Sequence, residues 1–261
     1  MNQQPPVPPL TISPLEGGIN FRDLGGLPAA NGRRVRPGLL FRSGTLAHLT
    51  PADRARLAAA RLTRVLDLRD AVETAREPDA LWDGARYENI PANPLGRGAG
   101  ASIDQYTPEF LEKLDPRKFM RDLYRELPLE NRAYRRLMAV LRETEPGAAT
   151  VFHCAVGKDR TGVAAAIVLL ALGADRATLL ADYTRTEQTL APHRERVQTA
   201  LAGKLDGLAL EHLRVLMAAR EEFIAVALAS IESRGGADAW LAAEFGLDAP
   251  ARAALQAKYL E

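Results

Sequence analysis

The residues best suited to chemistry lie between Cys154, the only cysteine of the chain, and Arg160. A thiolate is a strong nucleophile, and a guanidinium can hold two oxygens of an oxyanion in its planar fork. Gly157, between them, lets the backbone turn closely. A thiolate that faces a bound tetrahedral oxyanion is the arrangement needed for covalent phosphoryl transfer. The spacing therefore predicts a phosphate-binding loop with Cys154 as the nucleophile and Arg160 as the phosphate clamp.

Such a loop needs a strand before it and a helix after it. The apolar pair Val151-Phe152, bounded by Gly147 and polar residues, predicts a buried strand. Residues 163–172 are almost continuously apolar and Gly173 follows, which predicts a buried helix with a glycine stop. The amino terminus of a helix carries unpaired amides and partial positive charge, so it favours a bound anion next to the cysteine.

The wording of residues 153–162, HCAVGKDRTG, resembles the HCxxGKDRTG loop of a family of atypical bacterial protein tyrosine phosphatases that includes tyrosine/phosphoinositide phosphatases. Other motifs resemble that family in the same order along the chain. They are NFRDLGG at 20–26, FRSG at 41–44, LDLR at 66–69, DY at 182–183, WL at 240–241 and FGL at 245–247. The likeness covers about residues 17 to 261.

The resemblance implies a cysteine-dependent phosphatase that hydrolyses phosphotyrosine through a thiophosphoryl-enzyme intermediate. Phosphoserine/threonine and phosphoinositides stay open as further substrates, and no metal or other cofactor is expected. In the family the aspartate at position 159 is proposed as the general acid, and Asp67 of the LDLR motif is the rival. The expected phosphate-binding residues are Ala155, Val156, Gly157, Lys158 and Thr161. A catalytically silent phosphate- or phosphoinositide-binding module is the alternative function.

Some residues in these motifs have plainer interpretations. Lys158 is either a ligand for the extra phosphates of a phosphoinositide, as the family implies, or a solvated loop lysine. We expect His153 to orient the loop and, by strand alternation, to point away from Cys154. Loop bracing is favoured over substrate contact for Asn20, Arg22 and Asp23. The remaining histidines (His48, His193 and His212) show no metal-ligand spacing, so no metal site is predicted.

The pair Gly157-Lys158 also occurs in nucleotide-binding loops, which is a second interpretation of this segment. It would need glycine at position 152, where Phe152 stands, and serine or threonine at 159, where Asp159 stands. We therefore exclude it.

The rest of the chain predicts an α/β fold, with a mostly parallel central sheet flanked by helices and an extra helical lid. Residues 1–14 are a Pro-rich tail, and 15–261 form a single domain in which about 175–235 is the lid, by analogy with the family. Helices are expected at 51–62, 116–127, 132–144, 175–190, 192–201 and 210–232, with further strands at 65–68 and 87–90. Residues 91–102 are expected to form a mobile loop. In the 65–68 strand, Asp67 alternates with apolar residues and is expected to point away from the core.

Bulk properties are those of an ordinary globular protein: 261 residues, 47% hydrophobic and 26% charged. The net charge of +1 gives no reason to expect a nucleic-acid partner. Residues 1–9 lack the pattern of a signal peptide, and no segment is long and apolar enough for a membrane span. Cytoplasm is the default location, export without a signal stays open, and so does the oligomeric state. With one cysteine, no intrachain disulfide can form.

Overall fold

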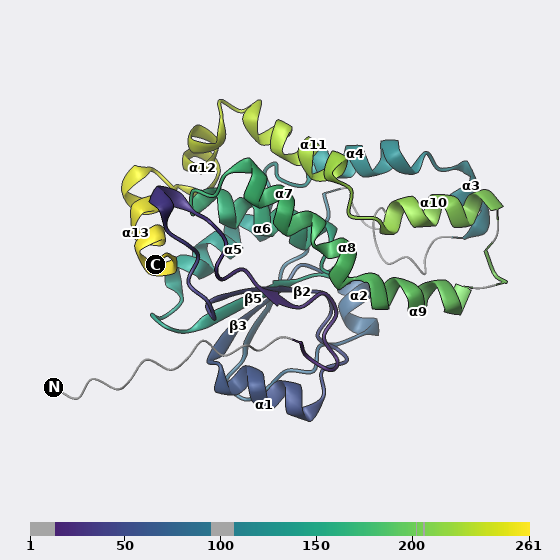
Figure 1. The fold of residues 1–261 in the computed structure, drawn as a ribbon, viewed down its shortest axis with the longest axis horizontal. Helices are drawn as coiled ribbons and strands as arrows, with labels where there is room; N and C mark the ends of the chain where they lie inside the picture. The colour runs from purple at the N-terminus through teal and green to yellow at the C-terminus, as the bar shows by residue number, and fades with distance from the viewer. Residues whose placement is uncertain (1–13, 95–106, 202, 206) are drawn as a thin grey trace.

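The structure, a computed structural model, describes residues 14–94, 107–201, 203–205 and 207–261. Its centre is a five-stranded sheet in the order β1-β2-β5-β3-β4 (Figure 1). The strands are β1 (Arg22–Asp23), β2 (Leu40–Ser43), β3 (Leu62–Asp67), β4 (Arg86–Asn89) and β5 (Ala149–His153). Only β1 runs antiparallel to its neighbour, so the predicted α/β class with a mostly parallel sheet is confirmed.

The register of the sheet brings three strand ends together. His153 at the end of β5 pairs with Ser43 at the end of β2 and with Asp67 at the end of β3. Parallel strands end at the same edge, and this edge is where ligands bind in such folds. Cys154 follows directly, so the sheet itself carries the predicted loop to that edge.

Both faces of the sheet are covered. On one face α1 (Pro51–Ala59) packs over Val65 and Val151, and it begins with a capping box between Thr50 and Asp53. On the other face α6 (Asp159–Ala171) is buried along nearly its whole length, as its continuous apolar run predicted. In Figure 1, α5, α6 and α7 lie above the sheet and α1 lies below it.

The remaining helices extend this second layer. Their bounds are α2 (Ala71–Arg76), α3 (Pro108–Lys113), α4 (Pro116–Glu126), α5 (Arg132–Glu143), α7 (Arg176–Thr184), α8 (Thr186–Thr189), α9 (Ala191–Leu201), α10 (Gly207–Met217), α11 (Glu221–Glu232), α12 (Ala237–Phe245) and α13 (Ala249–Tyr259). In Figure 1, α9, α10 and α3 extend beyond the edge of the sheet. None of the described helices is long and apolar enough to cross a membrane.

Two predicted helices are divided in the structure. The 175–190 segment forms α7 and α8, and the 210–232 segment forms α10 and α11. The second break has a tertiary cause: the main-chain oxygen of Ala218 accepts a hydrogen bond from Lys158, and the amide of Ala219 donates to the Glu187 carboxylate. These bonds engage backbone groups that a continuous helix would use internally.

Within the predicted lid, α7 and α11 contribute buried side chains to the core, whereas α9 has none. Parts of the 175–235 segment thus belong to the core, and its role as a lid stays a proposal. Residues 1–13 of the predicted tail and 95–102 of the predicted mobile loop lie outside the described residues.

Candidate active site

Cys154 lies at the wall of a cavity of about 500 Å³ and is only 2% exposed. Five more of the predicted site residues line the same cavity: Ala155, Val156, Lys158, Asp159 and Arg160. Gly157, Thr161 and Asp67 are not part of this lining. The structure thus brings the candidate nucleophile, the arginine and one of the two candidate acids to the same cavity.

The loop is held from outside through its carbonyl oxygens. The amide of Thr45 donates to the oxygen of Ala155 at 2.8 Å, and the Arg42 guanidinium donates to that of Gly157 at 2.8 Å. The Asn20 amide donates to the oxygens of both Val156 and Gly157, at 3.1 and 2.9 Å. With the carbonyls engaged on this side, the loop can present its amides to the other, as an anion nest requires.

Gly157 has φ +70°, and an added Cβ would lie 2.5 Å from the main-chain carbon of Ser43. Both the positive φ and the close approach to β2 require glycine at this position.

A buried ion-pair cluster supports this bracing. Asp182 on α7 accepts from Arg22 at 3.0 Å and from Arg42. Burial, together with the neighbouring Arg42, lowers the pKa of Arg22 to about 9. The Asp182 carboxyl is also desolvated, but the two guanidinium groups outweigh that effect and lower its pKa. The contacts of Asn20, Arg22 and Arg42 are those of a brace behind the loop.

Arg160 has a partner that the sequence did not reveal. Its two terminal nitrogens donate to the two Glu73 carboxylate oxygens at 2.6 and 2.8 Å, and both side chains are buried. Burial acts to lower the pKa of Arg160, but the hydrogen bonds that it donates to Glu73 and the charges of Cys154 and Glu73 raise it overall. This pairing fixes the orientation of the guanidinium and leaves other N–H donors of its five for a ligand. The spacing of Asp70 and Glu73 is that of a capping box, which indicates the start of α2. It does not indicate that Glu73 contacts Arg160.

Asp159 stands at the start of α6 among hydrogen-bond donors. The Tyr124 hydroxyl donates to its carboxylate at 2.8 Å, and the Lys158 ammonium lies 2.8 Å away. Tyr124 also shares a 2.5 Å hydrogen bond with the Tyr183 hydroxyl. Burial is the main cause that raises the pKa of both tyrosines well above the ordinary value, so both phenols stay neutral.

Lys158 is buried rather than solvated, so the expectation of a solvated loop lysine is wrong. It is 2% exposed, and its ammonium donates to the main-chain oxygens of Leu216 at 2.7 Å and Ala218 at 3.3 Å. The phosphoinositide role remains a prediction.

Asp67 is fully buried, which corrects the expectation that it points away from the core. Its side chain is instead enclosed by polar groups: Arg69, Tyr87 of β4 and His153 of β5. Its carboxylate accepts from Arg69 at 2.7 Å and from the Tyr87 hydroxyl at 2.8 Å. Burial alone would raise the pKa of Asp67, but the charge of His153 and the bonds from Arg69 lower it.

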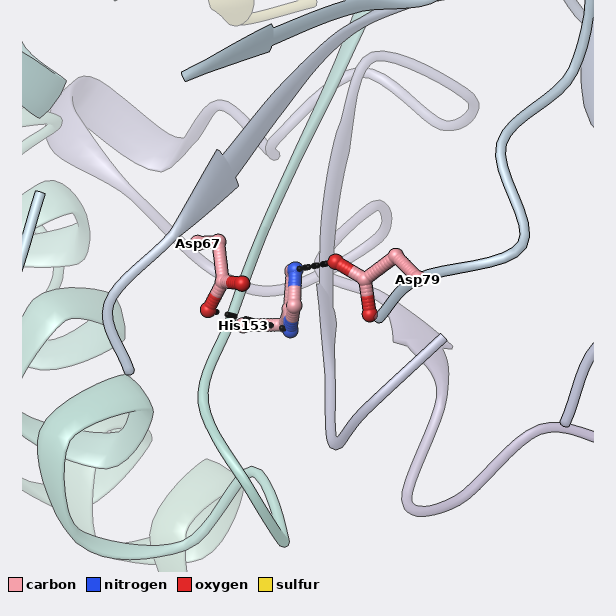
Figure 2. A group of neighbouring side chains, drawn as sticks. All are labelled: Asp67, Asp79 and His153. Atoms are coloured by element: carbon pink, nitrogen blue, oxygen red, sulfur yellow. Dashed lines mark ion pairs between the residues drawn. The ribbon is translucent and has the colours of Figure 1, made fainter. Parts of the chain in front are cut away.

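His153 lies between two carboxylates (Figure 2). Its Nε2 is 3.0 Å from Asp79, and its Nδ1 is 3.9 Å from Asp67 and 3.4 Å from the main-chain oxygen of Cys154. Burial would lower the pKa of His153, but the two carboxylates raise it above the ordinary value. Asp67, Asp79 and His153 could hold a metal ion by their spacing alone. Arg69 already bridges both carboxylates, at 2.7 and 2.9 Å, so with a protonated His153 the cluster is charge-balanced by protein groups.

The sequence matches known phosphatases over most of its length. A model of the tyrosine phosphatase family matches residues 13–261. A Cupriavidus necator protein named as a tyrosine-protein phosphatase is 34% identical over 220 residues, which cover 83% of this chain and 77% of the relative. The triple specificity protein phosphatase PtpB of Mycobacterium tuberculosis is 32% identical over 216 residues, 76% of this chain and 77% of PtpB. Among solved structures, P. aeruginosa TpbA gives a TM-score of 0.33 at 17% identity, covering 76% of this chain and 89% of that one. On the family match and these two relatives, the chain belongs to the tyrosine phosphatase family.

Proposed function

We propose that this tyrosine phosphatase family member hydrolyses phosphotyrosine by covalent catalysis, with Cys154 as the nucleophile. One observation carries the proposal: Cys154, Asp159 and Arg160 line the same cavity, on a loop whose carbonyl oxygens are tied away from it. A nucleophile, an acid and an anion clamp are the three parts that the reaction needs.

In the first step the Cys154 thiolate attacks phosphorus in line with the leaving group. Arg160 and the loop amides hold the three equatorial oxygens, where negative charge is spread in the transition state. These groups supply the positive field, so the mechanism invokes no metal ion. In the second step water hydrolyses the thiophosphoryl-enzyme.

Asp159 is the better candidate for the general acid. It lines the cavity, whereas Asp67 is buried against Arg69 and Tyr87 and does not. Although burial acts to raise the pKa of Asp67, His153 and Arg69 lower it overall, which disfavours the protonated form that a general acid needs. Asp159 would protonate the departing phenolate and then accept a proton from the attacking water.

The depth of the site favours phosphotyrosine over phosphoserine and phosphothreonine. Cys154 is almost inaccessible from the surface. An aryl phosphate extends further from the peptide backbone than a phosphoserine does, so it reaches the thiolate with less displacement of the cavity walls. Because the relative PtpB is named a triple specificity phosphatase, phosphoserine and phosphothreonine peptides should be tested beside the phosphotyrosine peptide.

The test is hydrolysis of a phosphotyrosine peptide in the presence of a chelator, for wild type beside three variants. Cys154→Ser should reduce kcat by about a thousandfold or more. Asp159→Asn should reduce it by roughly a hundredfold or more for a poor leaving group. Asp67→Asn should lower Tm, while the folded fraction should lose less kcat than Asp159→Asn does.

Two results would reject parts of this proposal. Wild type that binds phosphate without turnover would favour the silent binding module. A larger loss in folded Asp67→Asn than in Asp159→Asn would exchange the roles of the two carboxylates.

A further inference from the structure

The cavity over Cys154 is much larger than its phosphate site, and most of the extra wall is apolar. Its volume of about 500 Å³ is in the range that accommodates a drug-sized ligand. Its apolar wall includes Phe119, Met120 and Leu123 of α4, Val197 and Leu201 of α9, and Met217 of α10. We call this part of the cavity the apolar chamber. A phosphotyrosine side chain would fill only the region next to the loop.

The chamber is poorly suited to a second phosphate group. The wall that defines it carries no cation, and three of the four lysine and arginine side chains that line the rest of the cavity have close partners. Arg160 is paired with Glu73, Arg69 with Asp67 and Asp79, and Lys158 with Asp159 and the end of α10. A peptide backbone also fits badly, because its N–H and C=O groups would lose water without gaining partners from an apolar wall. The chamber therefore favours a substrate body that is itself apolar.

The α9 helix gives the length of the chamber. His193, Val197 and Leu201 line the cavity at intervals of four residues, on one face of the helix, with the imidazole at one end and the apolar pair at the other. At about 1.5 Å per residue, the eight steps from His193 to Leu201 extend about 12 Å. An extended chain advances roughly 3.5 Å for every three bonds, so this wall matches a chain of about ten bonds.

We propose that the chamber binds the hydrocarbon chain of single-phosphate esters of long-chain primary alcohols, and that these lipid-chain monophosphates are substrates. The inference rests on the proposed phosphatase function of the same loop. It concerns esters whose phosphate is on the end of the chain itself, since only then does the chain lie next to Cys154.

The reaction balances with the groups already named. The Cys154 sulfur forms a bond to phosphorus while the bond from phosphorus to the alcohol oxygen breaks, and Asp159 gives its proton to that oxygen. Water then attacks phosphorus, returns a proton to Asp159 and releases inorganic phosphate and the thiolate. An alkoxide is a poorer leaving group than a phenolate, so the reaction depends more strongly on Asp159.

The experiment measures phosphate release from butyl, octyl and dodecyl phosphate below their micelle concentrations, with phenyl phosphate and a short-chain phosphoinositide bisphosphate alongside. We expect kcat/KM to rise by up to about fourfold for each added methylene and to level off near ten carbons. A flat dependence on chain length, with phenyl phosphate still hydrolysed, would overturn the inference while leaving the proposed function intact. Preference for the bisphosphate over octyl phosphate would also overturn it.

Two variants of α9 provide a matched pair. Val197→Asp puts a charge into the chamber, while Gln198→Asp puts the same charge on an exposed neighbour outside the lining. The ratio of octyl to phenyl phosphate kcat/KM should fall at least about tenfold in the first and stay unchanged in the second. An alkyl chain bound against the new carboxylate would take it out of water without offering it a partner. Equal ratios in both variants would contradict the proposal.

A binding measurement on an inactive variant tests the chamber independently of catalysis. Calorimetry on Cys154→Ser should show octyl phosphate binding at least about a hundredfold more tightly than butyl phosphate. If wild type hydrolyses nothing, the proposed function fails, and this measurement still decides whether the chamber takes the chain.

Discussion

The Lys158 ammonium donates a 2.7 Å hydrogen bond to the main-chain oxygen of Leu216, and so ties the phosphate loop to the end of α10. The carbonyls of a last helical turn lack partners within the helix and carry partial negative charge, so a cation is favourable there. Met217, the next residue, lines the cavity. One lysine therefore couples the position of the loop to that of the cavity wall.

Replacing Lys158 with methionine keeps much of the volume and removes the donor. We expect the free energy of unfolding to fall by about 2 kcal/mol, the usual range for a hydrogen bond from a charged group. Amide hydrogen exchange should become faster in residues 207–217. Lys204→Met, at an exposed position before α10, should change the free energy by less than about 0.5 kcal/mol. Unchanged exchange in α10 of the Lys158 variant would show that the bond does not hold the helix.

A second prediction concerns Glu73, whose carboxylate holds Arg160. Glu73→Gln leaves a buried guanidinium without its counter-charge, so the free energy of unfolding should fall by about 3 kcal/mol. Added inorganic phosphate should then raise Tm more in the variant than in wild type, because the anion replaces the missing charge. Glu77→Gln is the control, since Glu77 pairs with His48 at an exposed site where such pairs contribute about 0–1 kcal/mol. An equal response of both variants to phosphate would argue against a phosphate site at Arg160.

The loop that holds Arg160 could be predicted from the sequence, whereas its contact with Glu73 could not. The strand, loop and helix from Val151 to Gly173 were predictable because every signal is local: an apolar run, a glycine turn and a glycine stop. Glu73 lies 87 positions from Arg160, and nothing in its neighbourhood reports that distant contact. Long-range ion pairs leave no periodic trace in a single sequence.

The break between α10 and α11 and the burial of Asp67 could not be predicted from the sequence, for a related reason. Apolar periodicity continues through residues 218–220. Only the bond that Lys158 donates to Ala218, and the one that the Ala219 amide donates to Glu187, reveal why the helix stops there. Alternation along β3 correctly separates Asp67 from its apolar neighbours. It could not show that this other side is also buried, because the polar groups around Asp67 come from other segments of the chain.

A third prediction follows from the raised pKa of His153. A raised pKa in the folded state means that the imidazolium stabilises the fold fully below about pH 6.5 and that this contribution is lost as pH rises through the folded pKa. The groups that face His153 are Asp67, Asp79 and Arg69. The free energy of unfolding should therefore fall above neutral pH, by up to about 1.4 kcal/mol per pH unit.

In Asp79→Asn this slope should become smaller, because one of the two carboxylates that raise the pKa of His153 is lost. Denaturant titrations between pH 7 and 9 in a Cys154→Ser background remove the thiol from the measurement. The pKa of His193 is lowered by burial, so its own titration lies below this window. Asp83→Asn, at an exposed position nearby, should keep the wild-type slope. A slope that survives the Asp79 substitution would assign the titration to another group.

The last prediction compares two glycines that both have a positive φ but differ in what surrounds them. Gly157 has φ +70° and Gly84 has φ +85°, but an added Cβ meets the backbone of Ser43 at 2.5 Å at the first position and nothing within 4 Å at the second. Gly84→Ala should cost about 1–2 kcal/mol of stability, the cost of a left-handed backbone. Gly157→Ala should cost more and should also move the loop away from β2, which displaces Cys154 and Arg160 relative to one another. A displacement of about 1 Å can reduce the rate about a hundredfold, so its kcat in the folded fraction should fall to that extent while Gly84→Ala keeps wild-type kcat. Equal kcat values in the two folded variants would mean that the close packing of Gly157 on β2 does not set the geometry of the site.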